Sequence, residues 1–165
     1  MFDHEKLEVY QLELRFLDWV NVLIEEIKKN NPGPIVREIC DHLGRAALSS
    51  LFNTAEGNGK RQMKIRSRYF DIARGSATEC ASCLDALVVV KACNQERILE
   101  GEKLLFRIVS MLTKLVIRFD SDLKIREEEV EYGVENEDDI EDEKGTQGKD
   151  KESRTRTSTT MRNDR

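Results

Sequence analysis

The sequence predicts an all-α fold, an antiparallel up-down-up-down four-helix bundle, followed by a charged tail. Three observations support this prediction. The chain has only two prolines, Pro32 and Pro34, so few positions interrupt a helix. Apolar residues recur at spacings of three and four over four long segments, without the alternation of a strand. Short breaks separate these segments, and amphipathic helices joined by short connections pack antiparallel to their neighbours.

The breaks set the expected helices at 4–30, 34–56, 61–92 and 95–119. The first break is the sequence NNPGP at 30–34, and the second is Gly57-Asn58-Gly59. The third falls near Cys93, where Asn94 is a suitable N-cap for the next helix. Within the third helix, the small residues Gly75-Ser76-Ala77 predict a close approach between helices, since a mid-helix glycine costs about 1 kcal/mol relative to alanine.

The first helix is apolar over a wider arc than one core face requires. It has two apolar stripes, one formed by Leu7, Tyr10, Leu14, Leu17 and Ile24, the other by Val9, Leu12, Phe16, Val20, Leu23 and Ile27. Two explanations remain open: a central helix covered by its own bundle, or burial of one stripe by another subunit. We interpret the single Trp19 as a core or interface residue rather than a ligand-binding group. The apolar side of the second helix includes Leu48 and Phe52.

Charge divides the chain into parts. Residues 1–119 contain 18 Lys/Arg and 16 Asp/Glu, residues 120–144 contain 3 and 13, and residues 145–165 contain 6 and 3. The apolar periodicity fades from about Ser121. A segment of this composition cannot bury enough apolar surface to offset the entropy of ordering it. We therefore expect a four-helix bundle over 1–120 and a disordered tail over 121–165, acidic first and then rich in Ser, Thr and Arg.

The sequence argues against a membrane protein, a secreted protein and a disulfide-rich protein. No stretch approaches about 18 consecutive apolar residues, so we expect no membrane span. The beginning of the chain lacks a basic patch followed by an apolar run, so we expect no signal peptide and a cytoplasmic location. In a cytosolic chain, the four cysteines are typical of reduced core residues rather than of a disulfide framework. They are Cys40, Cys80, Cys83 and Cys93.

Polar residues recur on the second and third helices where a plain bundle would have none. They are Arg45, Ser49, Asn53 and Glu56 on the second helix, and Arg74 and Glu79 among those on the third. Polar side chains that face a bundle core must pair, because an unpaired one costs roughly 1–3 kcal/mol. We interpret these six as a structural polar network beside solvated faces. A ligand site, or a contact with another subunit or partner, remains an alternative.

Five cations and no acid occur between residues 60 and 68, namely Lys60, Arg61, Lys64, Arg66 and Arg68. They lie at a helix N-terminus, where the helix dipole mildly disfavours positive charge. A basic cluster against that preference indicates an external anion, most simply a nucleic-acid backbone. The alternatives are a solvated basic face, or pairing with the acidic 120–144 tract, which would then compete with RNA for this surface.

The sequence predicts no cofactor, no metal and no enzymatic activity. Cys80 and Cys83 have metal-ligand spacing, but they lie inside a helix with no second pair and no nearby histidine. The only histidines are His4 and His42, too few for a persuasive nucleophilic triad. An enzyme hypothesis would rest on Glu56 and Glu79 as a carboxylate pair.

Two central motifs resemble a known family. Residues 43–61 are LGRAALSSLFNTAEGNGKR, similar to the signature RAALSIPxNIAEGxGR of the bacterial 23S rRNA intervening-sequence proteins. Residues 68–80, RYFDIARGSATEC, are similar to its RFLxIARGSxxE, and 7–12 and 105–112 also look like the family. The resemblance covers about residues 5–119. Two departures stand out: Ser50-Leu51 replaces Ile-Pro, and Thr54 replaces Ile.

The resemblance implies an antiparallel four-helix bundle that assembles into a ring-like homopentamer. It favours a second subunit as the cover of the extra stripe on the first helix. The function hypothesis is a non-enzymatic oligomer that binds RNA, either rRNA or its insertion, through the basic segment. The alternative is a protein-interaction adaptor, similar to the accessory protein of diversity-generating retroelements, which binds a reverse transcriptase.

Overall fold

Four helices account for most of residues 2–30 and 33–120, the part of the chain that this computed structural model describes. A 3₁₀ turn, η1 (Asp3–Lys6), precedes α1 (Glu8–Asn30), α2 (Pro34–Gly59), α3 (Met63–Val89) and α4 (Gln95–Phe119). No strand occurs in the described ranges. The predicted all-α class and the number of helices are confirmed. The predictions for the tail, 121–165, lie outside the described residues.

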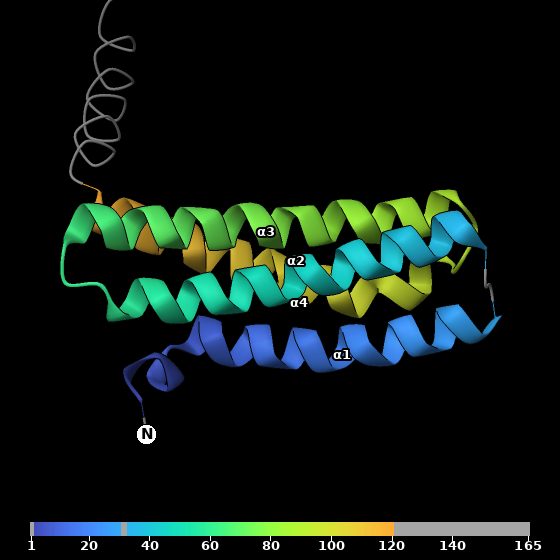
Figure 1. The fold of residues 1–165 in the computed structure, drawn as a ribbon, viewed down its shortest axis with the longest axis horizontal. Coiled ribbons are helices and arrows are strands. Elements are labelled where there is room, and N and C mark those ends of the chain that lie inside the picture. The colour runs from blue at the N-terminus through green and yellow to red at the C-terminus, as the bar shows by residue number, and fades with distance from the viewer. Residues whose placement is uncertain (1, 31–32, 121–165) are drawn as a thin grey trace, which may run out of the picture. The chain divides into compact units, whose positions relative to one another are not determined.

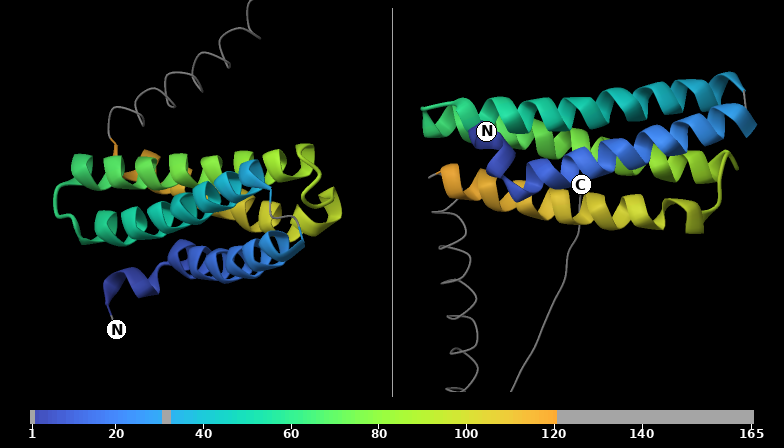
Figure 2. Two further views of the ribbon diagram at one scale, coloured as in Figure 1. Left: turned by 45° about the vertical axis from the view of Figure 1, so that its right-hand side comes forward. Right: turned by 90° about the horizontal axis from the view of Figure 1, so that it is seen from below.

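Consecutive helices run in opposite directions, so the chain traverses the bundle four times, up, down, up and down (Figure 1). α1 packs beside α2 and α4, α3 also packs beside α2 and α4, and the diagonal pairs make no comparable contact. The views in Figure 2 show the same order around the bundle. The connection between α2 and α3 lies at one end of the bundle, and the α1–α2 and α3–α4 connections lie at the other.

Local sequence explains most helix ends. Pro34 begins α2, where the missing N–H of proline is not needed. The Oδ1 of Asn94 accepts a hydrogen bond from the Arg97 backbone N–H at 3.0 Å, which confirms the predicted N-cap of α4. The break expected at residues 57–59 lies instead inside the last turn of α2, and the connection is Lys60–Gln62. Lys91, between α3 and α4, adopts φ 58°, the left-handed conformation that reverses the chain there.

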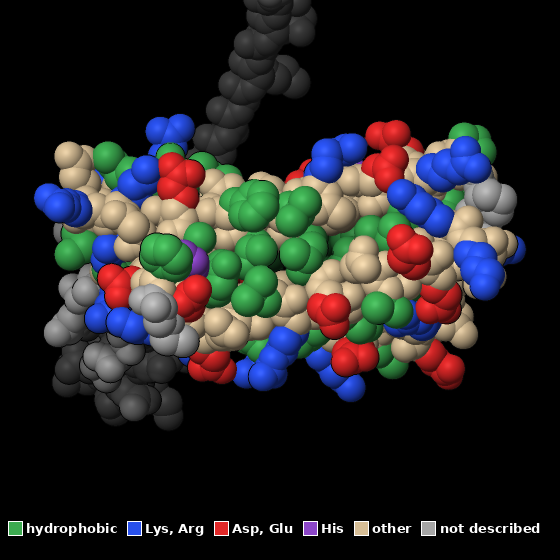
Figure 3. Space-filling view, turned by 60° about the horizontal axis from the view of Figure 1, so that its bottom comes forward, with side chains coloured by type: hydrophobic (Ala, Val, Ile, Leu, Met, Phe, Trp, Pro, Cys, Tyr) green, Lys and Arg blue, Asp and Glu red, His purple; other side chains and the backbone are tan. Residues whose placement is uncertain are grey.

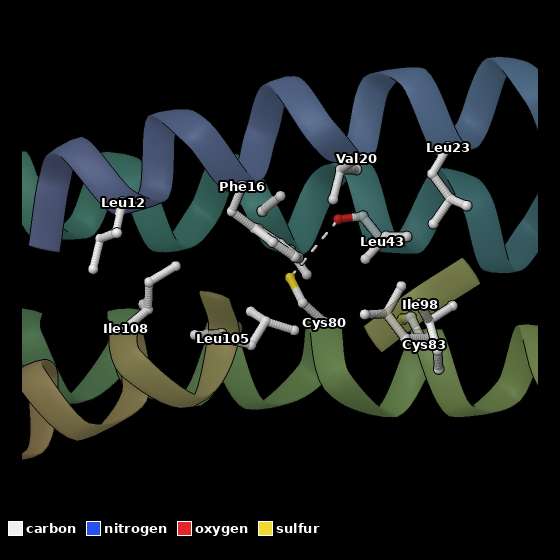
Figure 4. Packing of buried hydrophobic residues seen from close by; sticks show 14 of the residues in the cluster. Leu12, Phe16, Val20, Leu23, Leu43, Cys80, Cys83, Ile98, Leu105 and Ile108 are labelled. Atoms are coloured by element: carbon white, nitrogen blue, oxygen red, sulfur yellow. Dashed lines mark hydrogen bonds between the residues drawn. The ribbon is translucent and has the colours of Figure 1, made fainter. Parts of the chain in front are cut away.

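α1 contributes the second of its two apolar stripes to the core. Leu12, Phe16, Val20 and Leu23 meet apolar residues of the other three helices (Figure 4). The Sγ of Cys80 lies in the same core, 4.0 Å from the Leu43 carbonyl oxygen. Three of the cysteines, Cys40, Cys80 and Cys83, are buried and unpaired, as the composition predicted.

Close helix approach occurs at two glycines, and Gly75 is not one of them. A Cβ on Gly101 would lie 2.3 Å from Cζ3 of Trp19, and one on Gly57 would lie 2.9 Å from Cβ of Tyr69. A Cβ on Gly75 would meet nothing within 4 Å. The predicted close approach at Gly75-Ser76-Ala77 is therefore made by Ser76 and Ala77, which face the core, and not by Gly75, which faces outward. The hydroxyl of Ser76 lies 2.9 Å from that of Ser49 on α2.

Candidate nucleic-acid interface

The basic segment lies at the end of the bundle where α2 passes into α3 (Figure 1). Lys60 and Arg61 belong to the connection, and Lys64, Arg66 and Arg68 lie on the first two turns of α3. The structure therefore brings all five predicted cations to one end of the bundle. Their immediate contacts differ, and these contacts decide which of them present their charge to solvent.

Lys60 is partly neutralised within the protein. Its Nζ lies 2.8 Å from a carboxylate oxygen of Glu56 and 4.8 Å from the centre of the Tyr69 ring. The hydrogen bond to Glu56 raises the pKa of Lys60, and Lys60 in turn lowers the pKa of the Glu56 carboxyl. Lys60 thus stays charged, but an external phosphate would have to compete with Glu56 for it.

Arg66 is used to close the end of the bundle. Its Nη2 donates to the carbonyl oxygen of Asn58 at 2.9 Å, and its guanidinium lies 5.0 Å from the centre of the Phe119 ring. Its Nε is buried and has no hydrogen-bond partner among the described residues. The next residue, Ser67, donates to the carbonyl oxygen of Val116 at 3.1 Å. Arg66 and Ser67 therefore tie the ends of α2, α3 and α4 together.

Two of the remaining cations line an open groove. Arg61, Lys64 and Arg68 are exposed, and Lys64 and Arg68 line a groove of about 630 Å³ at the α3–α4 surface. Arg74 also lines it, with its Nη2 held 2.7 Å from the Asp71 carboxylate. Asp120 lies at the edge of the same groove. The groove is thus lined by three cations, Lys64, Arg68 and Arg74, and by two carboxylates, Asp71 and Asp120.

The six residues of the predicted polar network occupy separate places. Ser49 and Asn53 come together with Ser76, since the two serine hydroxyls are 2.9 Å apart and Asn53 donates to the Ser49 carbonyl at 2.8 Å. The other four each pair with a different charged or titratable side chain, three of them on the same helix or its end and Glu79 with a residue of α2. The partners of these four are Glu38 for Arg45, Lys60 for Glu56, Asp71 for Arg74 and His42 for Glu79.

The carboxylates of the enzyme hypothesis are far apart. Glu79 pairs with His42 of α2, and Glu56 lies fourteen residues further along that helix. At 1.5 Å per residue, this places the two glutamates about 20 Å apart along the bundle. They cannot act on one substrate bond together. No group of His, Cys, Asp or Glu side chains suited to a metal ion occurs in residues 2–30 and 33–120.

A buried polar cluster that the sequence pattern did not indicate is centred on Glu13 of α1. The side chain is 3% exposed, and its Oε1 accepts hydrogen bonds from Ser50 at 2.6 Å and Thr54 at 2.9 Å. Oε2 is buried without a hydrogen-bond partner among the described residues. Burial raises the pKa of Glu13 to about 7, although both hydroxyls act to lower it. Ser50 and Thr54 stand where the family signature has isoleucine, and this signal could have located the cluster.

Apolar side chains gather on the face shared by α1 and α2 (Figure 3). Leu14 of α1 and Leu48 and Phe52 of α2 are exposed, with Phe52 at 62%. Leu14 belongs to the first stripe of α1, so that stripe is incompletely covered by the protein's own bundle. A separate apolar surface lies on α4, where Phe106 is 77% exposed. Leu99, two turns earlier on the same helix, is exposed as well.

Trp19 packs on α4 rather than lining a ligand site. Its ring stacks on Phe16 with centroids 5.9 Å apart, and the guanidinium of Arg97 lies 5.5 Å from the ring centre. This confirms its interpretation as a packing residue. No helix of the described ranges has both the length and the apolar character needed to cross a membrane.

These features define a helical-bundle protein with a cationic end and an uncovered apolar face. The family model described as 23S rRNA-intervening sequence protein matches residues 5–114, and the chain belongs to this family. The resemblance found in the two central motifs is thereby confirmed. No curated protein and no solved structure matches the chain.

Proposed function

We propose that this chain is a non-enzymatic protein that assembles with copies of itself and binds structured RNA, with rRNA or its excised insertion as the expected target. The proposal rests on one observation above all: Arg61, Lys64 and Arg68 are exposed at one end of the bundle, where Lys64 and Arg68 line an open groove. The family's name, which refers to 23S rRNA, supports RNA over other polyanions. We expect the protein to act in the cytoplasm.

Self-assembly would supply most of the affinity. One subunit offers few phosphate contacts, but a ring presents the same cationic end several times. Linked contacts bind with an effective concentration that raises affinity without any new interaction. Each phosphate neutralised also releases counterions, so binding should weaken steeply with salt.

Two uncovered apolar surfaces support the assembly. One is the α1–α2 face with Leu14, Leu48 and Phe52, and the other is the α4 surface with Phe106. A ring of more than two subunits joins two different surfaces of neighbouring subunits, so it requires two such patches. We propose that the α1–α2 face packs against a second copy, in the ring-like pentamer that the family resemblance implies.

A salt titration of RNA binding tests the first half of the proposal. Replacing Arg61, Lys64 and Arg68 by alanine should weaken binding and reduce the log–log salt slope by about one for each phosphate that the variant no longer neutralises. The matched control replaces three exposed cations elsewhere, Lys29, Arg37 and Lys103, which keeps the change in net charge the same. Equal weakening in both triple variants, or no RNA binding by the wild-type protein at low salt, would refute the proposal.

Particle mass in solution tests the second half. The substitution Phe52→Glu should reduce the oligomer to smaller species, because a carboxylate would be buried at the interface. The control is Val89→Glu, at an exposed position at the far end of α3. A wild-type protein that is monomeric at micromolar concentration contradicts the assembly.

A protein-interaction adaptor remains the alternative, and a second groove favours it. This groove, of about 320 Å³, is lined by Ile39, Cys83 and Ala86 with Glu38, His42 and Glu79 among its other residues. It would suit an apolar segment carrying a positive charge. A partner whose binding is abolished in Ala86→Glu, together with RNA affinity absent at low salt, would favour the adaptor.

The tail offers a further test of RNA binding. If the acidic 120–144 tract competes with RNA for the basic end, deleting residues 121–165 should tighten binding. Weaker binding after the deletion would argue that the tail contributes to RNA contact instead.

A further inference from the structure

The α1–α2 pair is polar inside and apolar outside over two turns. Ser50 and Thr54 point inward to Glu13, while Leu48 and Phe52, on the same turns of α2, are exposed. Leu14, which follows Glu13 on α1, is exposed as well. The buried carboxyl therefore lies directly beneath the apolar face that we propose as the contact with a second copy.

No positively charged side chain lines the site of Glu13 in the described residues, and two hydroxyls are its hydrogen-bond donors. α2 contributes the Ser50 and Thr54 hydroxyls, and α4 contributes the apolar Leu105 and Ile108. α3 contributes Cys80, whose thiol is the one other titratable group among the described residues lining this site. Burial raises the pKa of Cys80, so it stays neutral. No Lys, Arg or His lines the site in the described ranges.

We propose that Glu13 couples proton binding to self-assembly through the α1–α2 face. Neutral Glu13 allows α1 to pack closely on α2, which keeps the shared apolar face in the shape that holds a second copy. The carboxylate form draws water or moves α1 outward, and the face is disturbed. This inference rests on the proposed assembly and adds its regulation.

The direction of the effect follows from burial. An ionised carboxylate with one unpartnered oxygen is costly in an apolar core, and covering the α1–α2 face with another subunit removes the nearest water. The assembled state thus favours the neutral form more than the free subunit does. Burial already places the pKa of Glu13 at about 7, so the response falls near neutral pH. Linkage limits the effect to about a tenfold change in subunit dissociation constant per pH unit for each glutamate that must be neutral.

The test measures particle mass by light scattering on the full chain from about pH 5.5 to about pH 8.5, a range that spans the expected transition. The wild-type oligomer should dissociate as the pH rises, and Glu13→Gln should remain assembled throughout because the amide cannot ionise. The control, Glu25→Gln, changes an exposed glutamate of the same helix and should respond as the wild-type protein does.

A second variant separates titration from a structural role. Ser50→Ala removes a hydrogen bond that stabilises the carboxylate, so the midpoint of dissociation should move to higher pH. A purely structural defect would weaken assembly at every pH without moving the midpoint.

Two outcomes overturn the proposal and can be told apart. If wild-type protein and Glu13→Gln stay assembled alike over the whole range, Glu13 does not regulate assembly, and the assembly itself stands. If the wild-type protein is monomeric even at the acid end, both the proposed assembly and its regulation fail. RNA binding of that monomer in the salt titration would then show whether the cationic end still acts.

Discussion

Replacing Gly101 by alanine places a methyl group where the indole of Trp19 already lies. The new Cβ would be 2.3 Å from Cζ3 and 2.4 Å from Cη2, well inside the roughly 3.5–4.0 Å of an optimal carbon contact. The ring cannot simply turn away, because Phe16 stacks on it and Arg97 lies over it. Relief of the clash requires α1 to move away from α4.

The size of the effect is set by two opposing terms. Overpacking a core costs about 1–3 kcal/mol, and a rigid ring at such short distances places this site at the upper end. In the opposite direction, the higher helix propensity of alanine stabilises the folded variant by about 1 kcal/mol relative to glycine. We expect Gly101→Ala to lower the free energy of unfolding by about 2 kcal/mol. Gly75→Ala, with open space around the new methyl group, should raise it by about 0.5–1 kcal/mol.

Urea unfolding followed by the helical circular-dichroism signal measures both variants. The same experiment in a Trp19→Leu background completes a double-mutant cycle, in which the cost of Gly101→Ala should shrink because the clashing ring is gone. Equal stability of Gly101→Ala and Gly75→Ala would refute the close approach of α1 and α4 at this point. An unchanged cost in the Trp19→Leu background would refute Trp19 as its cause.

The other predictions concern pH, a second glycine and a helix cap. Because the pKa of the Glu13 carboxyl is about 7 in the folded protein and about 4.5 in the unfolded chain, the folded state binds more protons between these values. The free energy of unfolding should therefore fall as pH rises through this window, by about 3 kcal/mol in total at about 1.4 kcal/mol per pH unit. Thermal unfolding of the wild-type protein at a series of pH values should follow this slope, and a Glu13→Gln profile with the same slope would contradict the prediction. Gly57→Ala should destabilise by about 1–3 kcal/mol in urea, since its Cβ would meet Tyr69 at 2.9 Å and Phe70 at 3.4 Å, and a stabilised variant would disprove the close packing of α2 on α3. Asn94→Ala should lower the free energy of unfolding by about 1 kcal/mol because it removes the N-cap of α4. Asn94→Ser keeps a capping oxygen and should retain most of the stability.

The helices were predictable because their signals are local. Proline and asparagine mark the starts of α2 and α4, and the stripe from Val9 to Ile27 identifies the buried side of α1. The predicted end of α2 falls three residues early because Gly57 and Gly59 have the spacing of a turn. If the helix is extended past Gly57, Glu56 and Lys60 lie four residues apart on one face, and this spacing predicts their ion pair. Lys60 would then have been predicted as a paired cation rather than as one available to an external phosphate.

The candidate site was less predictable because it depends on contacts between distant residues. Arg66 lies in a run of cations, yet its side chain meets Asn58 and Phe119, which no spacing within the run indicates. Glu13 lies on the buried stripe, but charged residues are rarely fully buried unless paired. Only the register of α1 against α2 brings two hydroxyls to it. The RNA contact and the oligomer remain predictions that the proposed experiments test.

The position of α1 in the bundle has a consequence for biosynthesis. α1 packs on α2, the next helix to be made, and on α4, the last. Between Asn30 and Phe119 the ribosome adds about 90 residues, which takes roughly 5–20 s at typical elongation rates. During that time the side of α1 that carries Trp19 has no partner within its own chain. The apolar side of α1 that packs on α4 is therefore exposed on the nascent chain until α4 has been made. Until then this surface can bind a chaperone or a neighbouring nascent copy.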